Sequence, residues 1–155
     1  MNQFDSIPDE LRALPQWVNW VSEMRDRKPS KHPIDPKTGR GASVDKPATW
    51  GTFKEALTLD PEHIGFVFTQ VDPYCGIDLD NCRDQKTGEV LQWAKDIAKK
   101  MSSYTEISPS GSGLHIIVKA KLPPGGNRKG NIELYDHSRF FCVTGDVYEA
   151  GDADD

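Results

Sequence analysis

The chain has 155 residues, of which 36% are hydrophobic and 28% charged, and its net charge at pH 7 is −5. These values fit a globular protein with one hydrophobic core, and we expect a single domain over 1–148 followed by an acidic tail or linker over 149–155. No apolar run approaches the roughly 20 residues of a membrane-spanning helix, and the N-terminus lacks a signal-peptide pattern, so we expect a cytoplasmic protein with no membrane partner. The cysteines are odd in number and form no CxxC motif, which favours buried thiols over disulfides or a zinc site: Cys75, Cys82 and Cys142.

The first third of the chain combines short regular elements with one long irregular segment. Residues 25–49 contain four prolines and two glycines, which favour turns over regular structure. A connection of this length inside a compact domain is usually functional or disordered. In chain order we expect a helix over 6–14 capped by Ser6, a strand over 16–23, the connection over 25–49, and a helix over 50–59 capped by Thr49.

The remainder of the chain predicts one clear helix among several strands. Apolar residues over 88–101 recur at steps of three and four, which indicates a helix. Strands are predicted over 64–69 and 74–80, and Asp72 and Pro73 between them favour a hairpin turn. Helices among mostly antiparallel strands predict an α+β fold. Four further strands are predicted at 104–108, 114–120, 131–136 and 139–145.

Two segments are basic although the whole chain is acidic. Residues 25–46 contain seven basic residues against three acidic ones, and residues 119–139 contain five against two. Positive charge gathered on an acidic protein suits contacts with phosphate groups. A solvated loop explains either segment about as well, so the charge pattern alone leaves both interpretations open.

Carboxylates and a histidine are expected on one side of a sheet. Asp78 and Asp80 stand two residues apart on one predicted strand, so their side chains point to the same face. His115 and Lys119 share a face of another strand, and Glu133 points away from the apolar residues beside it. Three converging carboxylates repel one another, and a hard cation such as Mg²⁺ or Mn²⁺ relieves that repulsion. The pattern therefore favours metal-assisted phosphoryl chemistry, although paired aspartates on an exposed strand also arise by chance.

A serine- and glycine-rich segment, SPSGSGLH at 108–115, leads into the strand that carries His115. Glycine lets backbone N–H groups approach an anion, and the hydroxyls of Ser110 and Ser112 add donors. A tight hairpin loop needs the same residue types, so a purely structural role is the alternative. Its position next to the predicted carboxylate patch favours a phosphate-binding loop.

In their order and spacing these motifs resemble the primase–polymerase (prim-pol) domain of the archaeo-eukaryotic primase superfamily, in the form found in phage and plasmid replication proteins. The resemblance rests on a strand ending in two acids (GIDLD), a serine–glycine loop running into a strand histidine (YTEISPSGSGLHI), a later acid (NIELYD) and the segment SRFFCVTG. The upstream segment KHPIDPKTGRGASVDKPATWGTFKEA is similar as well.

The resemblance implies a role for each of the polar residues. Asp78, Asp80 and Glu133 would bind catalytic Mg²⁺ or Mn²⁺ ions, in what is expected to be a two-metal site, and His115 would act beside them on the nucleotide phosphates. Asp136 competes with Glu133 as the third acid, but its place at a strand end favours a capping role. Further nucleotide contacts are implied for Ser110, Ser112, His115, Lys119 and Arg139.

The resemblance also implies a fold and an activity. A small N-terminal α/β unit would pack beside a palm-like sheet related to the RNA-recognition motif, with the active site between them. The protein would add nucleotides to a strand as a metal-dependent, template-directed DNA primase and polymerase, in a prokaryotic or phage-infected cell. Its substrates would be dNTPs or NTPs with single-stranded DNA template and primer, and a helicase or helical accessory domain is a candidate partner. A catalytically weak nucleotide- or DNA-binding module of a larger replisome, and a metal-dependent nuclease, are the alternatives.

Overall fold

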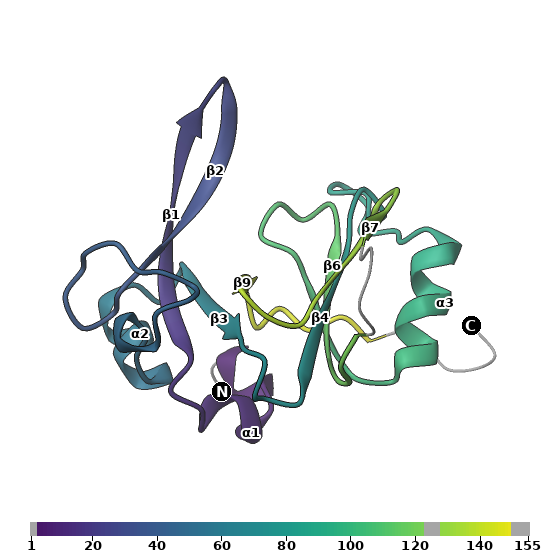
Figure 1. Ribbon diagram of the computed structural model, residues 1–155. Helices are drawn as coiled ribbons and strands as arrows, with labels where there is room; N and C mark the ends of the chain where they lie inside the picture. The colour runs from purple at the N-terminus through teal and green to yellow at the C-terminus, as the bar shows by residue number, and fades with distance from the viewer. Residues whose placement is uncertain (1–2, 123–127, 150–155) are drawn as a thin grey trace.

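The computed structural model describes residues 3–122 and 128–149, which form two sheets with short helices beside them (Figure 1). The four-stranded sheet has the order β2-β1-β3-β9, and the five-stranded sheet has the order β5-β6-β4-β8-β7. Every ladder between these strands is antiparallel. The predicted α+β class with mostly antiparallel strands is confirmed.

The first strand is longer than predicted, and a second strand follows it. β1 (Trp17–Arg25) pairs along most of its length with β2 (Lys28–Ile34), so the two form a hairpin. The prediction of an irregular connection over 25–49 is wrong for this part. Pro29 and Pro33 are tolerated because β2 lies at the edge of its sheet, where backbone positions facing outward need no N–H donor.

The helix predicted over 6–14 is divided in two. A 3₁₀ turn, η1 (Gln3–Ser6), precedes a four-residue helix, α1 (Asp9–Arg12). Ser6 does not cap α1, because its hydroxyl donates to two backbone carbonyls elsewhere and Pro8 occupies the cap position.

The second helix also begins later than predicted. A 3₁₀ turn, η2 (Pro47–Thr49), is followed by α2 (Phe53–Leu59). The cap is Thr52 rather than Thr49, since Thr52 and Glu55 exchange the two hydrogen bonds of a capping box. The Thr49 hydroxyl instead donates to carbonyls of the preceding loop.

The two central strands match their predicted positions but do not form a hairpin. β3 (Ile64–Phe68) lies between β1 and β9, whereas β4 (Tyr74–Leu79) lies between β6 and β8 in the other sheet. The buried Asp72 carboxylate accepts hydrogen bonds from the backbone N–H groups of Thr69 and Tyr74. This turn therefore sends the chain from one sheet into the other instead of folding it back.

The C-terminal half supplies the rest of the five-stranded sheet and returns to the first one. Helix α3 begins four residues later than predicted, because Gly88 has a φ of 77° and Val90 forms a bridge with Arg83. The four predicted strands are confirmed within one or two residues, and the short β7 was not predicted. β9 pairs with β3, so the last strand completes the four-stranded sheet. These elements are α3 (Gln92–Met101), β5 (Tyr104–Ile107), β6 (Leu114–Lys119), β7 (Arg128–Lys129), β8 (Ile132–Tyr135) and β9 (Arg139–Val143).

Two apolar clusters cover the two faces of the five-stranded sheet. One face packs against α3 through Ile77, Leu79, Leu114 and Ile116. The opposite face packs against the four-stranded sheet through an aromatic group that includes Phe66, Phe68, Tyr74 and Phe141. Gly76 of β4 permits this approach, because a Cβ there would collide with the rings of Phe68 and Phe141. The three cysteines are buried thiols, as predicted.

The predicted acidic tail, 149–155, lies outside the described residues except for Glu149. Among the residues that the structure describes, no helix has the length and apolar character needed to cross a membrane.

Candidate active site

The predicted polar face of the five-stranded sheet exists, and the strand register brings its residues together. Asp78 of β4 stands directly opposite His115 of β6 on one side and Glu133 of β8 on the other. Residues opposed in neighbouring antiparallel strands have their Cβ atoms about 5 Å apart and point to the same face. This face is the one that packs, further along the strands, against the four-stranded sheet.

Asp78 lies in an electrostatically unfavourable position. Its Oδ1 atom is buried without a hydrogen-bond partner, and Nε2 of His115 lies 3.5 Å away from it. Burial, followed by the neighbouring carboxylates of Asp80 and Glu133, raises the pKa of Asp78 to about 8, and Lys31 opposes the shift only partly. Three acids therefore gather at one point with too little positive charge to balance them.

These acids fit a divalent cation in chemistry, but they are not already arranged around one. No three metal-binding side chains of the described residues stand in a ready coordination geometry. Glu133 is held by Arg128, whose Nε lies 3.2 Å from Oε1 of the carboxylate. The Asp78 oxygen without a hydrogen-bond partner suits a bound cation, since carboxylate oxygens are the ligands that Mg²⁺ and Mn²⁺ prefer.

His115 is fixed in position and orientation. Its Nδ1 donates to the carbonyl oxygen of Cys142 in β9 at 3.0 Å, and its ring stacks on Phe141 with centroids 4.5 Å apart. A carbonyl can only accept, so Nδ1 carries the proton and Nε2 faces Asp78. Burial lowers the pKa of His115 to about 4, so the ring is neutral near pH 7.

Glu106 is a further buried acid that the sequence did not point out. It lies on β5 opposite His115, and its carboxylate accepts hydrogen bonds from the N–H groups of Thr144 and Gly145 and from the Tyr104 hydroxyl, at 2.7 to 3.2 Å. Burial raises its pKa to about 7. The hydrogen bonds of Glu106 and His115 thus hold β9, which belongs to the four-stranded sheet, against the five-stranded sheet. The sequence contained one indication of this residue: a charged glutamate in the middle of the otherwise apolar and hydroxyl-bearing strand segment YTEIS.

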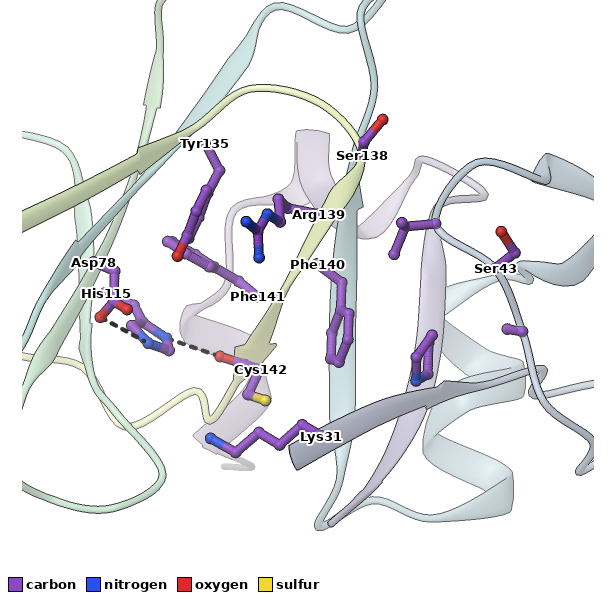
Figure 2. A pocket seen from close by; sticks show the side chains of 13 residues that line it. Lys31, Ser43, Asp78, His115, Tyr135, Ser138, Arg139, Phe140, Phe141 and Cys142 are labelled. Atoms are coloured by element: carbon purple, nitrogen blue, oxygen red, sulfur yellow. Dashed lines mark hydrogen bonds and ion pairs between the residues drawn. The ribbon is translucent and has the colours of Figure 1, made fainter. Parts of the chain in front are cut away.

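A cavity of about 560 Å³ opens between the two sheets at this point (Figure 2). Asp78 and His115 lie on one side, and the rest of the lining comes from β2, the loop at 42–44, Tyr135 and the segment that leads through β9 (Figure 2). Arg139 packs over the Tyr135 ring, and Lys31 reaches in from β2 (Figure 2). The Lys31 side chain also passes over the Trp20 ring, 5.2 Å from its centroid. Two cations and one carboxylate, that of Asp78, thus line the same cavity, which suits a ligand with both phosphate and metal. The other two acids adjoin Asp78 but are not among the lining residues.

The serine–glycine loop adjoins the acids, but its hydroxyls do not line this cavity. Ser110 and Ser112 hydrogen-bond each other at 2.8 Å. Gly113 passes so close to the strand end that a Cβ would collide with the carbonyl of Leu79, next to Asp80. The loop therefore lies beside Asp80, with two adjacent hydroxyls presented at its exposed end.

Two other predicted residues lie away from the cavity. Lys119 shares a sheet face with His115, but it stands at the far end of β6 opposite Tyr74 and binds the Glu10 carboxylate at 2.7 Å. Asp136 accepts from the Leu122 N–H and from a histidine beside it, as a capping residue does. The register thus brings Glu133, not Asp136, to Asp78.

No protein-family model matches the chain. A DNA primase-polymerase of Nitratiruptor phage NrS-1 is 36% identical to it over 152 residues, which cover 92% of the chain. Nearly the whole chain is thus similar to one part of a phage primase–polymerase. The resemblance read from the motifs is therefore confirmed. The match covers 21% of the phage protein, so the chain spans about a fifth of the length of this relative.

Proposed function

We propose that the chain is a metal-dependent, template-directed nucleotidyltransferase that adds nucleotides to a DNA strand during phage or plasmid replication. The observation that carries the proposal is the register that sets Asp78 between His115 and Glu133, at a cavity bordered by Lys31 and Arg139. Homology to a phage primase–polymerase supports the same activity.

In this proposal Asp78, Asp80 and Glu133 hold two Mg²⁺ or Mn²⁺ ions. Bound there, the ions would make the attacking hydroxyl of a primer more acidic and stabilise the leaving pyrophosphate. The crowding of the acids favours this role, since each loses a costly repulsion when cations arrive. To bind a metal, Glu133 would give up its ion pair with Arg128, and the Arg128 guanidinium would then be available to bind a phosphate.

The triphosphate of the incoming nucleotide would lie in the cavity. Arg139 and Lys31 supply positive charge, and Ser110 and Ser112 offer hydroxyls from the neighbouring loop. Nε2 of His115 points to the same space, and a bound phosphate would favour its protonated, donating form. Lys119 is too far along its strand for this contact.

The finer architecture fits the activity. The five-stranded sheet with α3 on one face and the acids on the other would serve as the palm related to the RNA-recognition motif. The four-stranded sheet would form the opposite wall of the active site. dNTPs or NTPs, a single-stranded template and a primer are then the substrates.

The test is incubation of the protein with Mn²⁺ or Mg²⁺, labelled nucleotides and a single-stranded template, with and without a primer. Lengthened primers that disappear in Asp80→Asn support the proposal, and Asp84→Asn is a matched control because Asp84 lies on a nearby exposed turn. A protein that binds template and nucleotide but extends nothing is a binding module. A protein that shortens labelled strands in the presence of metal is a nuclease. Either result contradicts the proposal.

A further inference from the structure

The β1–β2 hairpin extends beyond the sheet to which it belongs. β1 pairs with β3 only over three residues, from Trp17 to Asn19, while its pairing with β2 continues to Arg25. The outer part, residues 20–33, is therefore a two-stranded arm whose tip stands clear of the rest of the molecule (Figure 1). Isolated two-stranded ribbons are marginal in water, so an arm of this length is a costly feature if it contacts nothing.

One face of the arm turns toward the cavity. The register joins Trp20 to Pro33, Ser22 to Lys31 and Met24 to Pro29, so these six residues share a face. Lys31 and Pro33 of this face line the cavity itself. The same face continues outward to Met24, whose side chain is 68% exposed beside Pro29. The face is thus apolar at both ends, near the cavity and near the tip, with the polar pair of Ser22 and Lys31 between them.

The charge of the arm is opposite to that of the chain. Residues 20–33 contain four basic side chains and two acidic ones, on a chain whose net charge is −5. Glu23 lies on the outer face, where it approaches His32 at 3.9 Å, so it does not oppose the inner face. At the tip, Arg27 holds a left-handed backbone with a φ of 66°, and the register places Lys28 on the outer face, at the end of the arm. Apolar side chains on the inner face suit contacts with bases, and the cations at the tip suit contacts with phosphates.

We propose that the inner face and the tip of this arm bind the single-stranded template as it enters the active site. Arg27 and Lys28 contact its phosphates, and Met24 with Pro29 packs against its bases. The statement that the bound DNA leads into the active site rests on the proposed function. The binding of DNA to the arm is measured without nucleotide or metal.

The experiment measures the affinity of the protein for a labelled single-stranded DNA oligonucleotide by fluorescence anisotropy, at 50 and 200 mM salt. Each phosphate contact contributes roughly 0.7 to the slope of log affinity against log salt, so loss of two contacts flattens the slope by about 1.4. Over this fourfold salt range, the ratio of the two Kd values should fall about sevenfold in Arg27→Ala/Lys28→Ala. Met24→Ser should weaken binding at both salts without changing the slope, because an apolar contact releases no counterion.

The matched control is Lys99→Ala/Lys100→Ala, which makes the same change of charge at the last turn of α3, on the far side of the five-stranded sheet (Figure 1). The control should keep the wild-type slope. Equal slopes in the tip variant and the control, or a wild-type protein that does not bind the oligonucleotide, would overturn the inference. Binding through the tip in a protein that extends no primer would support the arm while contradicting the proposed polymerase activity, so the two failures are distinguishable.

Discussion

Replacement of Asp78 by asparagine should stabilise the metal-free protein, and increasingly so as the pH rises. The substitution keeps the shape of the side chain and removes the charge that burial, Asp80 and Glu133 disfavour. An aspartate in an unfolded chain has a pKa of about 4, whereas that of Asp78 in the folded protein is raised to about 8. Between these values the folded protein keeps a proton that the unfolded chain has released, so the stability of the wild type falls as the pH rises.

The magnitude follows from the same shift. Within that window the wild type should lose about 1.4 kcal/mol relative to Asp78→Asn for each pH unit, which for a chain of this size is about 3 to 5 °C in Tm. Scanning calorimetry in the presence of a chelator, at pH 5, 6, 7 and 8, measures the difference between the two proteins. Glu106 titrates in both, so its contribution cancels.

Addition of Mg²⁺ or Mn²⁺ should reverse the order of stability. The cation should stabilise the wild type at pH 8 and leave Asp78→Asn nearly unchanged, and the variant should extend no primer. Glu62→Gln, at an exposed loop position, serves as the control and should follow the wild type. If the melting curves of the wild type and Asp78→Asn stay parallel from pH 5 to pH 8, Asp78 has an ordinary pKa and the crowding of the acids is refuted.

Two other substitutions test how the nucleotide is held. His115→Ala should raise KM for the nucleotide, with or without a fall in kcat, while calorimetric titration of Mn²⁺ stays near the wild-type value; a collapse of metal affinity would make His115 a metal ligand. Glu106→Gln should lower stability by about 1 to 3 kcal/mol, because an amide cannot accept all the bonds of the carboxylate, and it should raise KM by loosening the strand that anchors His115. An unaltered KM in a destabilised Glu106→Gln protein would restrict that residue to a structural role.

Local patterns in the sequence predicted most of the strands and the faces of the site. The alternation around Asp78, His115 and Glu133 predicted that their side chains share a side, because a strand has only two faces. Alternation does not say how far apart two residues of one face lie. Lys119 is four residues beyond His115 on β6, a distance of about 13 Å, and it therefore lies outside the cavity.

Pairings between distant segments could not be predicted in this way. The prolines of β2 indicate a loop unless one knows that the strand lies at an edge. The turn at Asp72 looks like a hairpin turn from its composition, yet it leads into another sheet. His115 is held by the backbone carbonyl of Cys142, and because every residue has a backbone carbonyl, this partner could not be predicted from the sequence.

The position of β9 has a consequence for how the protein is made on the ribosome. The four-stranded sheet begins with β1 near the N-terminus, but its fourth strand is Arg139–Val143 and pairs with β3 from Ile64 to Phe68. During synthesis the edge of β3 therefore stays open while more than seventy further residues are added. Such late, long-range pairing slows folding and leaves an apolar edge open to association with other chains. A chain halted just before β9 would contain every acid of the site, yet it would lack the strand that orients the histidine.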